Sequence, residues 1–474
     1  MSHYNLKTMK HIFGIFVITL CLFSTNRLSA QASSTQGTEF YLTFTLNGTY
    51  TPTNPGLACQ VRYVVTEGCY ITAQYGDGTY LDDNVYYAPG VYTRDTDKNK
   101  SYYYSTGSGT SNKMMKITST QNIGVYALNM YHATTDATTI LPVTALGNDY
   151  TIMSNNATWS PINNIAIIAP TAGTTFTIRQ PNGTAVLSNQ PITAYNQPYF
   201  YASSVNFTGY TVESNYNVAV FSAVACGDPA PGGACDHNYE QMPPTNTAGK
   251  NYLLWSMSPP DASPGGNPNG YDSYKIIGLE NSTTVTRKRG AAIDIIALNK
   301  NQATALIYTP GALTDNPYVN NSSGMVEFTS DKPFLVEHIL GHAPCIKWIA
   351  PVEQRITNAM LTPFIPAGNS VIAYHRLHLM IPAGAESNMV MKETRSGVTT
   401  NETLTFYTNT TNPDYVIAYK QYTATDNVLI QLANPSGFIA YMVGYGSYES
   451  YIYTAGAGAF NLQSYFTITT KTTP

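Results

Sequence analysis

Short runs of β-branched and aromatic residues recur along the chain, and polar segments rich in glycine and proline separate them. Typical runs read QVRYVVT, CYITAQY, GVYTRDT, FTIRQ, VAVFSAV and FLVEHIL, and typical separators read PTAGT, QPNGT and SPGGNPNG. Runs of this composition between turn signals predict β-strands. No segment sustains the apolar spacing of an amphipathic helix, so the sequence predicts an all-β fold.

The strand pattern repeats four times. Related segments read ITSTQNIGVYALN, VESNYNVAVFSAV, FTSDKPFLVEHIL and LANPSGFIAYMVG, and their starts lie 95, 116 and 104 residues apart, at Ile117, Val212, Phe328 and Leu432. In each segment, a second apolar residue six positions later opens an apolar strand. A repeat of this length indicates a module of about 100 residues.

A second marker, a glycine followed three residues later by an aromatic residue, gives the start of each module. It reads GTEFYLTF, GNDYTIMS and GKNYLLWS, with a degenerate fourth copy, ITNAMLTPF. We therefore predict β modules at 33–146, 147–248, 249–355 and 356–474, the last with a C-terminal strand. Each holds about seven short strands, which favours a β-sandwich. A β-propeller with two blades per module is the alternative.

The N-terminus has the pattern of an export signal. Lys7 and Lys10 precede an apolar run at 12–23, and small residues follow at Ala30 and Ala32. This order predicts a signal peptide over 1–32. The apolar run is shorter than the roughly 20 residues that span a bilayer, and no later run approaches that length. We expect a secreted or cell-surface protein without a membrane span.

The composition argues against nucleic acid as a partner. Charged residues make up 11% of the chain and the net charge is −4, against about 25% charged residues in ordinary globular proteins. Without a basic patch the chain is not expected to bind nucleic acid. The 38 tyrosines cluster in NVYYAPGVY, SYYYSTG, QPYFYASS and GYGSYESYIY. Such clusters suit recognition surfaces, and they are equally typical of ordinary sheet edges, so both interpretations stand.

Five cysteines follow the predicted signal peptide. Cys59 and Cys69 are close in sequence, as are Cys226 and Cys235, and an exported protein matures where disulfides persist. We therefore predict two disulfides, Cys59–Cys69 and Cys226–Cys235. Cys345 is left over and is expected to be free.

One stretch, ACDHNYEQMPPTNTAG at 234–249, concentrates residues that could carry chemistry. Asp236, His237 and Glu240 are the binding candidates. The stretch aligns with TTDATTILPVTALGNDY in the preceding module, where only the aspartate, the proline and the glycine recur. These are turn and cap residues. We therefore interpret the stretch as a stapled link between modules, rank a ligand or metal site second, catalysis last, and expect His237 to be dispensable.

Other histidines do not form a predicted metal site. His338 and His342 are four apart, but on a strand they lie about 13 Å from each other, too far to share zinc. His375 and His378 point to opposite faces of a strand. No nucleophile elbow, P-loop or Ca²⁺ loop appears. We predict no catalytic residues, no metal site and no cofactor.

Several motifs in order resemble a known family. GTEFYLTF, KITSTQNIGVYALN, VAVFSAVACGDPAPGGACDHNYEQ, FTSDKPFLVEHILGH and AYMVGYGSYESYIYTAG are similar to the N-terminal domain of IgG Fc-binding proteins, over about Gly37 to Ala457. The resemblance implies a secreted protein that binds an extracellular protein or glycoprotein, with immunoglobulin and mucin-like proteins as candidates. The alternative is a secreted hydrolase acting on polysaccharide or glycoprotein.

Overall fold

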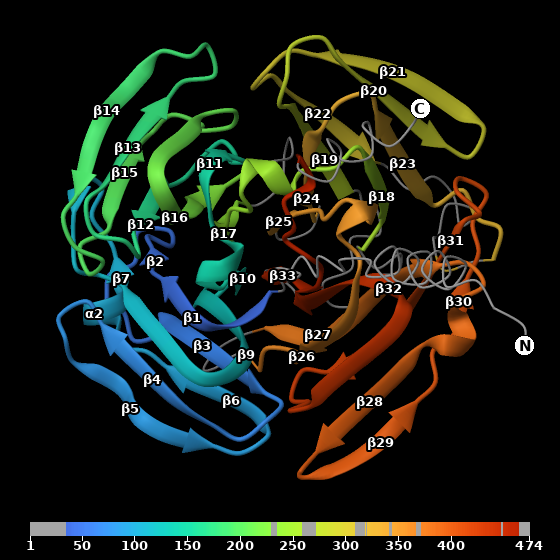
Figure 1. The fold of residues 1–474 in the computed structure, drawn as a ribbon, viewed down its shortest axis with the longest axis horizontal. Helices are drawn as coiled ribbons and strands as arrows, with labels where there is room; N and C mark the ends of the chain where they lie inside the picture. Colours follow the sequence, from blue (N-terminus) through green and yellow to red (C-terminus); the bar gives the residue numbers. More distant parts are fainter. Residues whose placement is uncertain are drawn as a thin grey trace, which may run out of the picture. The chain divides into compact units, whose positions relative to one another are not determined.

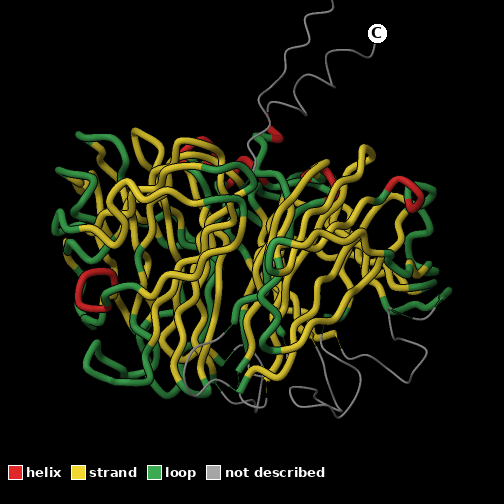
Figure 2. Tube along the Cα trace, turned by 90° about the horizontal axis from the view of Figure 1, so that it is seen from below, coloured by secondary structure: helices red, strands yellow, loops and turns green. Residues whose placement is uncertain are grey.

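The computed structural model describes residues 35–228, 235–257, 272–308, 318, 320–340, 344–365, 371–446 and 449–463. The predicted signal peptide lies outside them. The described residues all belong to one compact unit, 33–474. Figure 2 shows that strands make up most of the trace of this unit and that helices are confined to short turns. The all-β prediction is confirmed.

The strands fall into four sets, which follow the chain order. Set 1 contains β1 (Gln36–Leu42), β3 (Ala58–Val65), β4 (Cys69–Tyr75), β5 (Tyr80–Tyr87), β6 (Gly90–Asp95), β9 (Met115–Tyr131) and β10 (Thr134–Ile140). Set 2 contains β11 (Gly147–Thr151), β12 (Asn163–Ile168), β13 (Thr174–Arg179), β14 (Ala185–Ile192), β15 (Tyr199–Ser203), β16 (Thr211–Gly227) and β17 (Asp236–Gln241), with β8 (Gly109–Thr110) added beside β15.

Sets 3 and 4 repeat the arrangement. Set 3 contains β18 (Asn251–Trp255), β19 (Asp272–Gly278), β20 (Thr283–Arg289), β21 (Ala292–Leu298), β22 (Ala303–Tyr308), β23 (Met325–Ser330), β24 (Phe334–Ile339) and β25 (Ile346–Trp348). Set 4 contains β26 (Ile356–Leu361), β27 (Ile372–Pro382), β28 (Val390–Arg395), β29 (Val398–Glu402), β30 (Phe406–Tyr407), β31 (Tyr415–Thr423), β32 (Leu429–Gly446) and β33 (Ser450–Gly456).

The remaining elements are short. A parallel pair joins β2 (Phe44–Thr45) to β7 (Tyr102–Tyr103). The helical turns are α2 (Lys98–Ser101), η1 (Val143–Ala145), η2 (Thr245–Thr247), η4 (Val352–Gln354) and η5 (Glu386–Asn388). In η1, η2 and η4 a proline precedes the turn, and each turn leads from the last strand of one set to the first strand of the next.

One long strand holds each set together. The first half of β9 lies between β1 and β4, whereas its second half lies between β3 and β10. The strands β16 and β32 divide in the same way, and in set 3 the two halves are separate strands, β23 and β24. Each set is therefore built from two antiparallel half-sheets. The sandwich-like fold class is confirmed, and we propose that the sets are the four modules predicted from the sequence.

The innermost strands β10, β17, β25 and β33 contact one another near the centre of Figure 1. Every side chain on these four strands is buried. Set 1 also packs on set 4, because Arg62 donates to Thr362 Oγ1 at 3.3 Å and to the Pro363 carbonyl, and the Tyr126 hydroxyl donates to the Met360 carbonyl at 2.8 Å. The four sets thus close into a ring within this unit.

A recurring glycine closes sets 1, 2 and 3 on themselves. A methyl group on Gly147 would lie 2.6 Å from Cβ of Pro244, so only glycine allows this approach of the first strand to the end of set 2. The Gly147 amide donates to the Tyr150 hydroxyl, which donates to the Val218 carbonyl. The same contacts join Gly249 to Pro351 and, through Tyr252, to Phe334. This lock explains the glycine and the tyrosine of the marker in sets 2 and 3.

The cysteines only partly follow the prediction. Cys226 and Cys235 form a disulfide, with Cα atoms 5.1 Å apart, whereas Cys59, Cys69 and Cys345 are buried free thiols. The predicted Cys59–Cys69 disulfide is wrong, because Cys59 lies near the start of β3 whereas Cys69 begins β4, beyond the far end of β3. Six strand residues extend about 20 Å, and bridged Cα atoms lie within about 7 Å.

Candidate functional site

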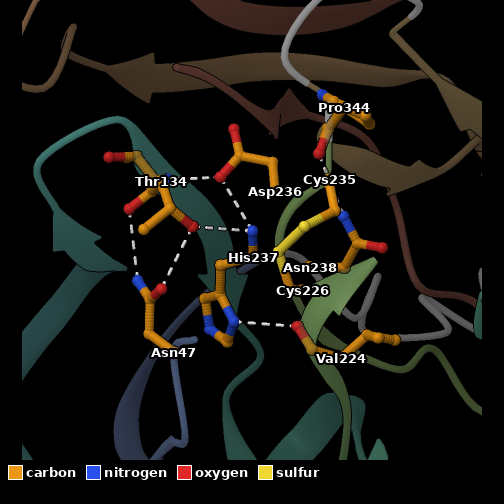
Figure 3. Close-up of a disulfide and its surroundings, with 10 residues drawn as sticks. Asn47, Thr134, Val224, Cys226, Cys235, Asp236, His237, Asn238 and Pro344 are labelled. Atoms are coloured by element: carbon orange, nitrogen blue, oxygen red, sulfur yellow. Dashed lines mark hydrogen bonds between the residues drawn. A yellow bond between two sulfur atoms is a disulfide. The ribbon is translucent and has the colours of Figure 1, made fainter. Parts of the chain in front are cut away.

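Asp236, His237 and Glu240 lie on β17, one of the innermost strands, and not on a turn-rich surface link. All three side chains are at most 1% exposed. The expectation of a surface link was wrong, because the stretch forms a buried strand whose Asp236, His237 and Glu240 side chains each contact a neighbouring strand. Asp236 Oδ2 and Glu240 Oε2 have no hydrogen-bond partner among the described residues. Figure 3 shows this surrounding for Asp236 and His237, next to the disulfide.

The His237 ring is held on both sides. Its Nδ1 contacts the Val224 carbonyl at 3.0 Å, and its Nε2 contacts the Asn129 side-chain amide nitrogen at 2.9 Å. Because an amide nitrogen only donates and a carbonyl only accepts, the ring is neutral with its hydrogen on Nδ1. Burial lowers the pKa of His237 to about 3. The ring is therefore a structural hydrogen-bonding group. Its burial does not agree with the expectation that His237 is dispensable for stability.

Asp136 and Asp236 connect sets 1 and 2 reciprocally. Asp236 Oδ1 accepts from the Thr135 amide at 2.9 Å, and Asp136 Oδ2 accepts from the Tyr239 amide at 3.0 Å. Burial raises the pKa of both carboxyl groups well above the ordinary value. Each aspartate thus satisfies a backbone donor on the opposite strand, which is what a buried amide requires.

Glu240 links three sets at one point. Its Oε1 accepts from Thr138 Oγ1 on β10 at 2.9 Å and lies 2.5 Å from Lys347 Nζ on β25. Burial raises the pKa of Glu240 to about 7, and burial likewise lowers the pKa of Lys347. Glu240 and Lys347 form a buried ion pair. Removing either partner would leave the charge of the other one buried and unpaired.

These residues cannot meet a ligand, because the inner strands enclose them. A hydrolase needs two carboxyl groups about 5 to 10 Å apart in a cleft, and the carboxyl groups of Asp136, Asp236 and Glu240 have no such access. Within the described ranges, no group of three or more histidine, cysteine, aspartate or glutamate residues is arranged to hold a metal ion.

Three further histidines, His338, His375 and His378, lie on strands, as the sequence predicts. His338 is on β24, where its Nε2 lies 3.0 Å from Asp272 Oδ2. His375 and His378 are on β27, and both are buried. His342 lies outside the described residues. In the described part of the chain, these histidines belong to no group of three or more side chains that could hold a metal ion.

A polar groove of about 390 Å³ opens between sets 2 and 3. Asp149 on β11 and Glu213 on β16 are cross-strand partners in its wall, and Lys250, Glu280 and Lys300 complete its charges. Burial and the neighbouring Glu213 raise the pKa of Asp149. The groove combines charges of both signs, which suits a polar ligand.

A second groove, of about 290 Å³, opens between sets 4 and 1. Gln36 and Thr66 of set 1 face Asn358, Lys392 and Gln431 of set 4 across it. Its remaining lining residues are mostly apolar. The polar groups that line this groove are amides and a hydroxyl, and Lys392 is its one charged lining residue.

An aromatic surface lies beside the disulfide end of set 2. The Tyr50 and Tyr131 rings stack at 3.6 Å, and Trp159 lies 6.5 Å from Tyr50. Trp159 is 62% exposed. Gly48, with φ of 56°, leaves room for the Tyr50 and Trp159 rings, since a methyl group there would lie 2.8 Å from Tyr50. We call Tyr50, Tyr131 and Trp159 the aromatic surface.

The aromatic surface could not be predicted from the sequence, because its three residues are far apart in the chain. The only signal was a tryptophan within a polar segment, NNATWSP. Most tyrosines in the clusters quoted above are buried, which supports their interpretation as sheet residues. Tyr86 and Tyr104 are exposed exceptions. The Tyr86 ring on β5 lies 5.4 Å from the ring of Tyr70, its exposed cross-strand partner on β4.

Among the described residues, the structure contains no helix with the length and apolarity needed to cross a membrane.

Comparisons with known proteins place these features in context. The family model described as IgGFc binding protein matches residues 136–444. A human protein named IgGFc-binding protein is 29% identical over 145 residues, which are 29% of this chain and 3% of the relative, so the chain spans only a small part of that protein. A solved Ca²⁺-stabilised adhesin, which helps an Antarctic bacterium bind ice, covers 90% of this chain and 99% of its own at 11% identity. Its TM-score of 0.12 supports no conclusion about the fold.

Proposed function

Because the chain belongs to the IgGFc-binding protein family, we propose that it is an exported, non-enzymatic binding protein. Its ligand is an extracellular protein or glycoprotein, with the Fc region of immunoglobulin as the first candidate and mucin-like proteins as the second. The family name and the human relative that carries it support this choice of partner.

The aromatic surface is the observation that carries the proposal. Exposed tryptophan and tyrosine are the residues that most often dominate binding energy at protein interfaces. Trp159 is the most exposed aromatic side chain in the described part of the chain, and Gly48 leaves room for the adjoining Tyr50 ring. Trp159 also lies inside the residues that the family model matches. We assign ligand contact to this surface.

Export is supported by two independent features. Residues 1–32 have the order of a signal peptide, and the Cys226–Cys235 disulfide is of a kind that persists outside the cytoplasm. Export would bring the aromatic surface into contact with extracellular ligands.

The test is binding of the purified chain to immobilised IgG, its Fc and Fab fragments, and mucin, measured by biolayer interferometry. We expect saturable binding to at least one of these, and Trp159→Ala should weaken it roughly 30-fold, the effect of a 2 kcal/mol hot spot. Tyr216→Ala removes an aromatic ring that is 48% exposed elsewhere on set 2 and serves as the matched control.

Two outcomes would contradict the proposal. Absence of binding to all four ligands would remove immunoglobulin and mucin as partners. Cleavage of IgG or mucin during incubation, detected by mass spectrometry, would favour the hydrolase alternative, for which Asp149 and Glu213 in the groove between sets 2 and 3 are the carboxyl groups to replace first.

A further inference from the structure

A lysine, an asparagine and a glutamate meet in the interior where sets 2 and 3 are in contact. Lys275 lies on β19, and Glu337 is its cross-strand partner on β24. Asn155 follows β11 in set 2 and precedes Lys275 by 120 residues in the chain. The fold thus brings an amine, a carboxamide and a carboxyl group to one point.

The lysine amine lies within hydrogen-bonding distance of both other groups. Lys275 Nζ lies 2.7 Å from Asn155 Oδ1 and 2.9 Å from Glu337 Oε2. Because a carbonyl bond is about 1.2 Å long, the Asn155 Cγ lies within about 4 Å of the amine, close to the 3–3.5 Å separation of groups poised to react. Asn155 Nδ2 donates to Asn238 Oδ1 at 3.3 Å, which turns the carbonyl side of the amide toward the lysine.

The site is almost closed to solvent. Asn155 is 2% exposed, Glu337 1% and Lys275 8%. Glu337 Oε1 has no hydrogen-bond partner among the described residues, and burial raises the pKa of this carboxyl group. An enclosed ammonium–carboxylate pair carries a large desolvation cost. Transfer of one proton from Lys275 to Glu337 removes both charges and leaves a neutral amine, which is the nucleophilic form of lysine.

We propose that Lys275 and Asn155 are joined by an isopeptide bond that forms inside the folded protein, with Glu337 as the proton shuttle. Glu337 takes a proton from the ammonium, and the amine attacks Asn155 Cγ. A bond forms between Nζ and Cγ, and the bond between Cγ and Nδ2 breaks. Glu337 gives its proton to the departing nitrogen and takes the remaining excess proton from Nζ.

The reaction is balanced without any further reactant. The products are a secondary amide, one molecule of ammonia and a protonated Glu337. Neither oxidation nor reduction occurs. Glu337 is catalytic because it contacts the reacting nitrogen, whereas Asn238 positions the amide.

Lys347 provides an internal contrast. It is also buried and paired with a carboxylate, Glu240, at 2.5 Å. In the described part of the chain, however, no side-chain amide is hydrogen-bonded to its ammonium, so no carboxamide carbon is poised beside it. The arrangement around Lys275 is therefore more than a buried ion pair.

The bond would join set 2 to set 3 covalently across a long loop. Cross-links that close long loops restrict the unfolded chain most. The junction between the two sets would then resist pulling and heat independently of reducing agents, unlike the Cys226–Cys235 disulfide.

The test is the intact mass of the purified, fully reduced wild-type chain. We expect a mass lower than that of the sequence by about 17 Da, the mass of ammonia lost in this covalent modification. A tryptic digest should contain one branched peptide that joins the Asn155 and Lys275 segments. Lys275→Arg keeps the positive charge and should restore the full mass, as should Glu337→Gln. Glu240→Gln removes the carboxylate beside Lys347 and should retain the deficit.

The wild-type measurement decides the matter even if a variant folds poorly. A reduced wild-type chain with the full sequence mass would overturn the proposal. A deficit that persists in Lys275→Arg, or a branched peptide through a different lysine, would also overturn it. Retention of the deficit in Glu337→Gln would remove Glu337 as the shuttle and with it the proposed mechanism.

Discussion

Replacing Tyr252 by phenylalanine tests whether the glycine–tyrosine lock stabilises a set. The Tyr252 hydroxyl accepts from the Gly249 amide at 3.2 Å and donates to the Phe334 carbonyl at 2.5 Å, and the ring is buried. The substitution keeps the ring and removes both hydrogen bonds. Each is worth about 0.5 to 1.5 kcal/mol, and a buried group left without a partner costs about 1 to 3 kcal/mol. We expect the free energy of unfolding to fall by about 2 to 4 kcal/mol.

Equilibrium unfolding in guanidinium chloride measures the effect, with an unchanged slope indicating that only stability has changed. Hydrogen exchange followed by mass spectrometry should show faster exchange in the peptide that contains Gly249. Tyr150→Phe breaks the equivalent lock in set 2 and should cost a similar amount. Tyr216→Phe, on an exposed ring, should cost almost nothing. If Tyr252→Phe cannot be distinguished from Tyr216→Phe, the lock does not stabilise the fold.

Three further predictions concern the interior. Intact mass of the unreduced protein should show a single disulfide and three free thiols, and Cys235→Ser should lower stability by about 2.5 to 3 kcal/mol; a second disulfide would contradict the placement of the thiols. His237→Ala should cost about 2 to 4 kcal/mol in a thermal melt. The folded pKa of His237, about 3, is below the ordinary 6.5, so the unfolded chain binds a proton at this histidine at higher pH than the folded chain does. The free energy of unfolding should therefore decline as pH falls from about 6.5 toward 3, and His237→Gln should make this decline less steep. An unchanged pH dependence in His237→Gln would refute the prediction. Glu240→Gln should cost about 3 to 5 kcal/mol by leaving the Lys347 charge unpaired, and adding Lys347→Met should recover much of it; no recovery in the double variant would contradict the pairing.

The strands could be predicted because they depend on local composition. The segments starting at Ile117, Val212 and Leu432 lie in β9, β16 and β32, as their apolar runs indicate. The strand β17 was missed because its residues Asp236–Gln241 are polar, and a polar strand is stable in an interior only through partners on distant strands. Nothing in the local sequence reports those partners.

The errors in the candidate site have a similar cause. Cys59 and Cys69 are close in sequence but are separated by the length of a strand, which depends on where the chain turns. Trp159 gains its significance from Tyr50 and Tyr131, which no sequence spacing connects. Lys275 and Asn155 are brought together only by the contact between two sets. Contacts between residues far apart in the chain could therefore not be predicted from the sequence.

The contact between sets 1 and 4 has a consequence for how the protein is made. Tyr126 donates its hydrogen bond to Met360, 234 residues later in the chain, and the same face of set 1 contributes Val64 and Leu128 to a core completed by set 4. During synthesis this apolar face has no native cover until the last quarter of the chain has emerged. Contacts of such long range slow folding, and exposed apolar surface in the meantime promotes aggregation. The nascent chain should therefore depend on a chaperone that shields set 1 until set 4 arrives.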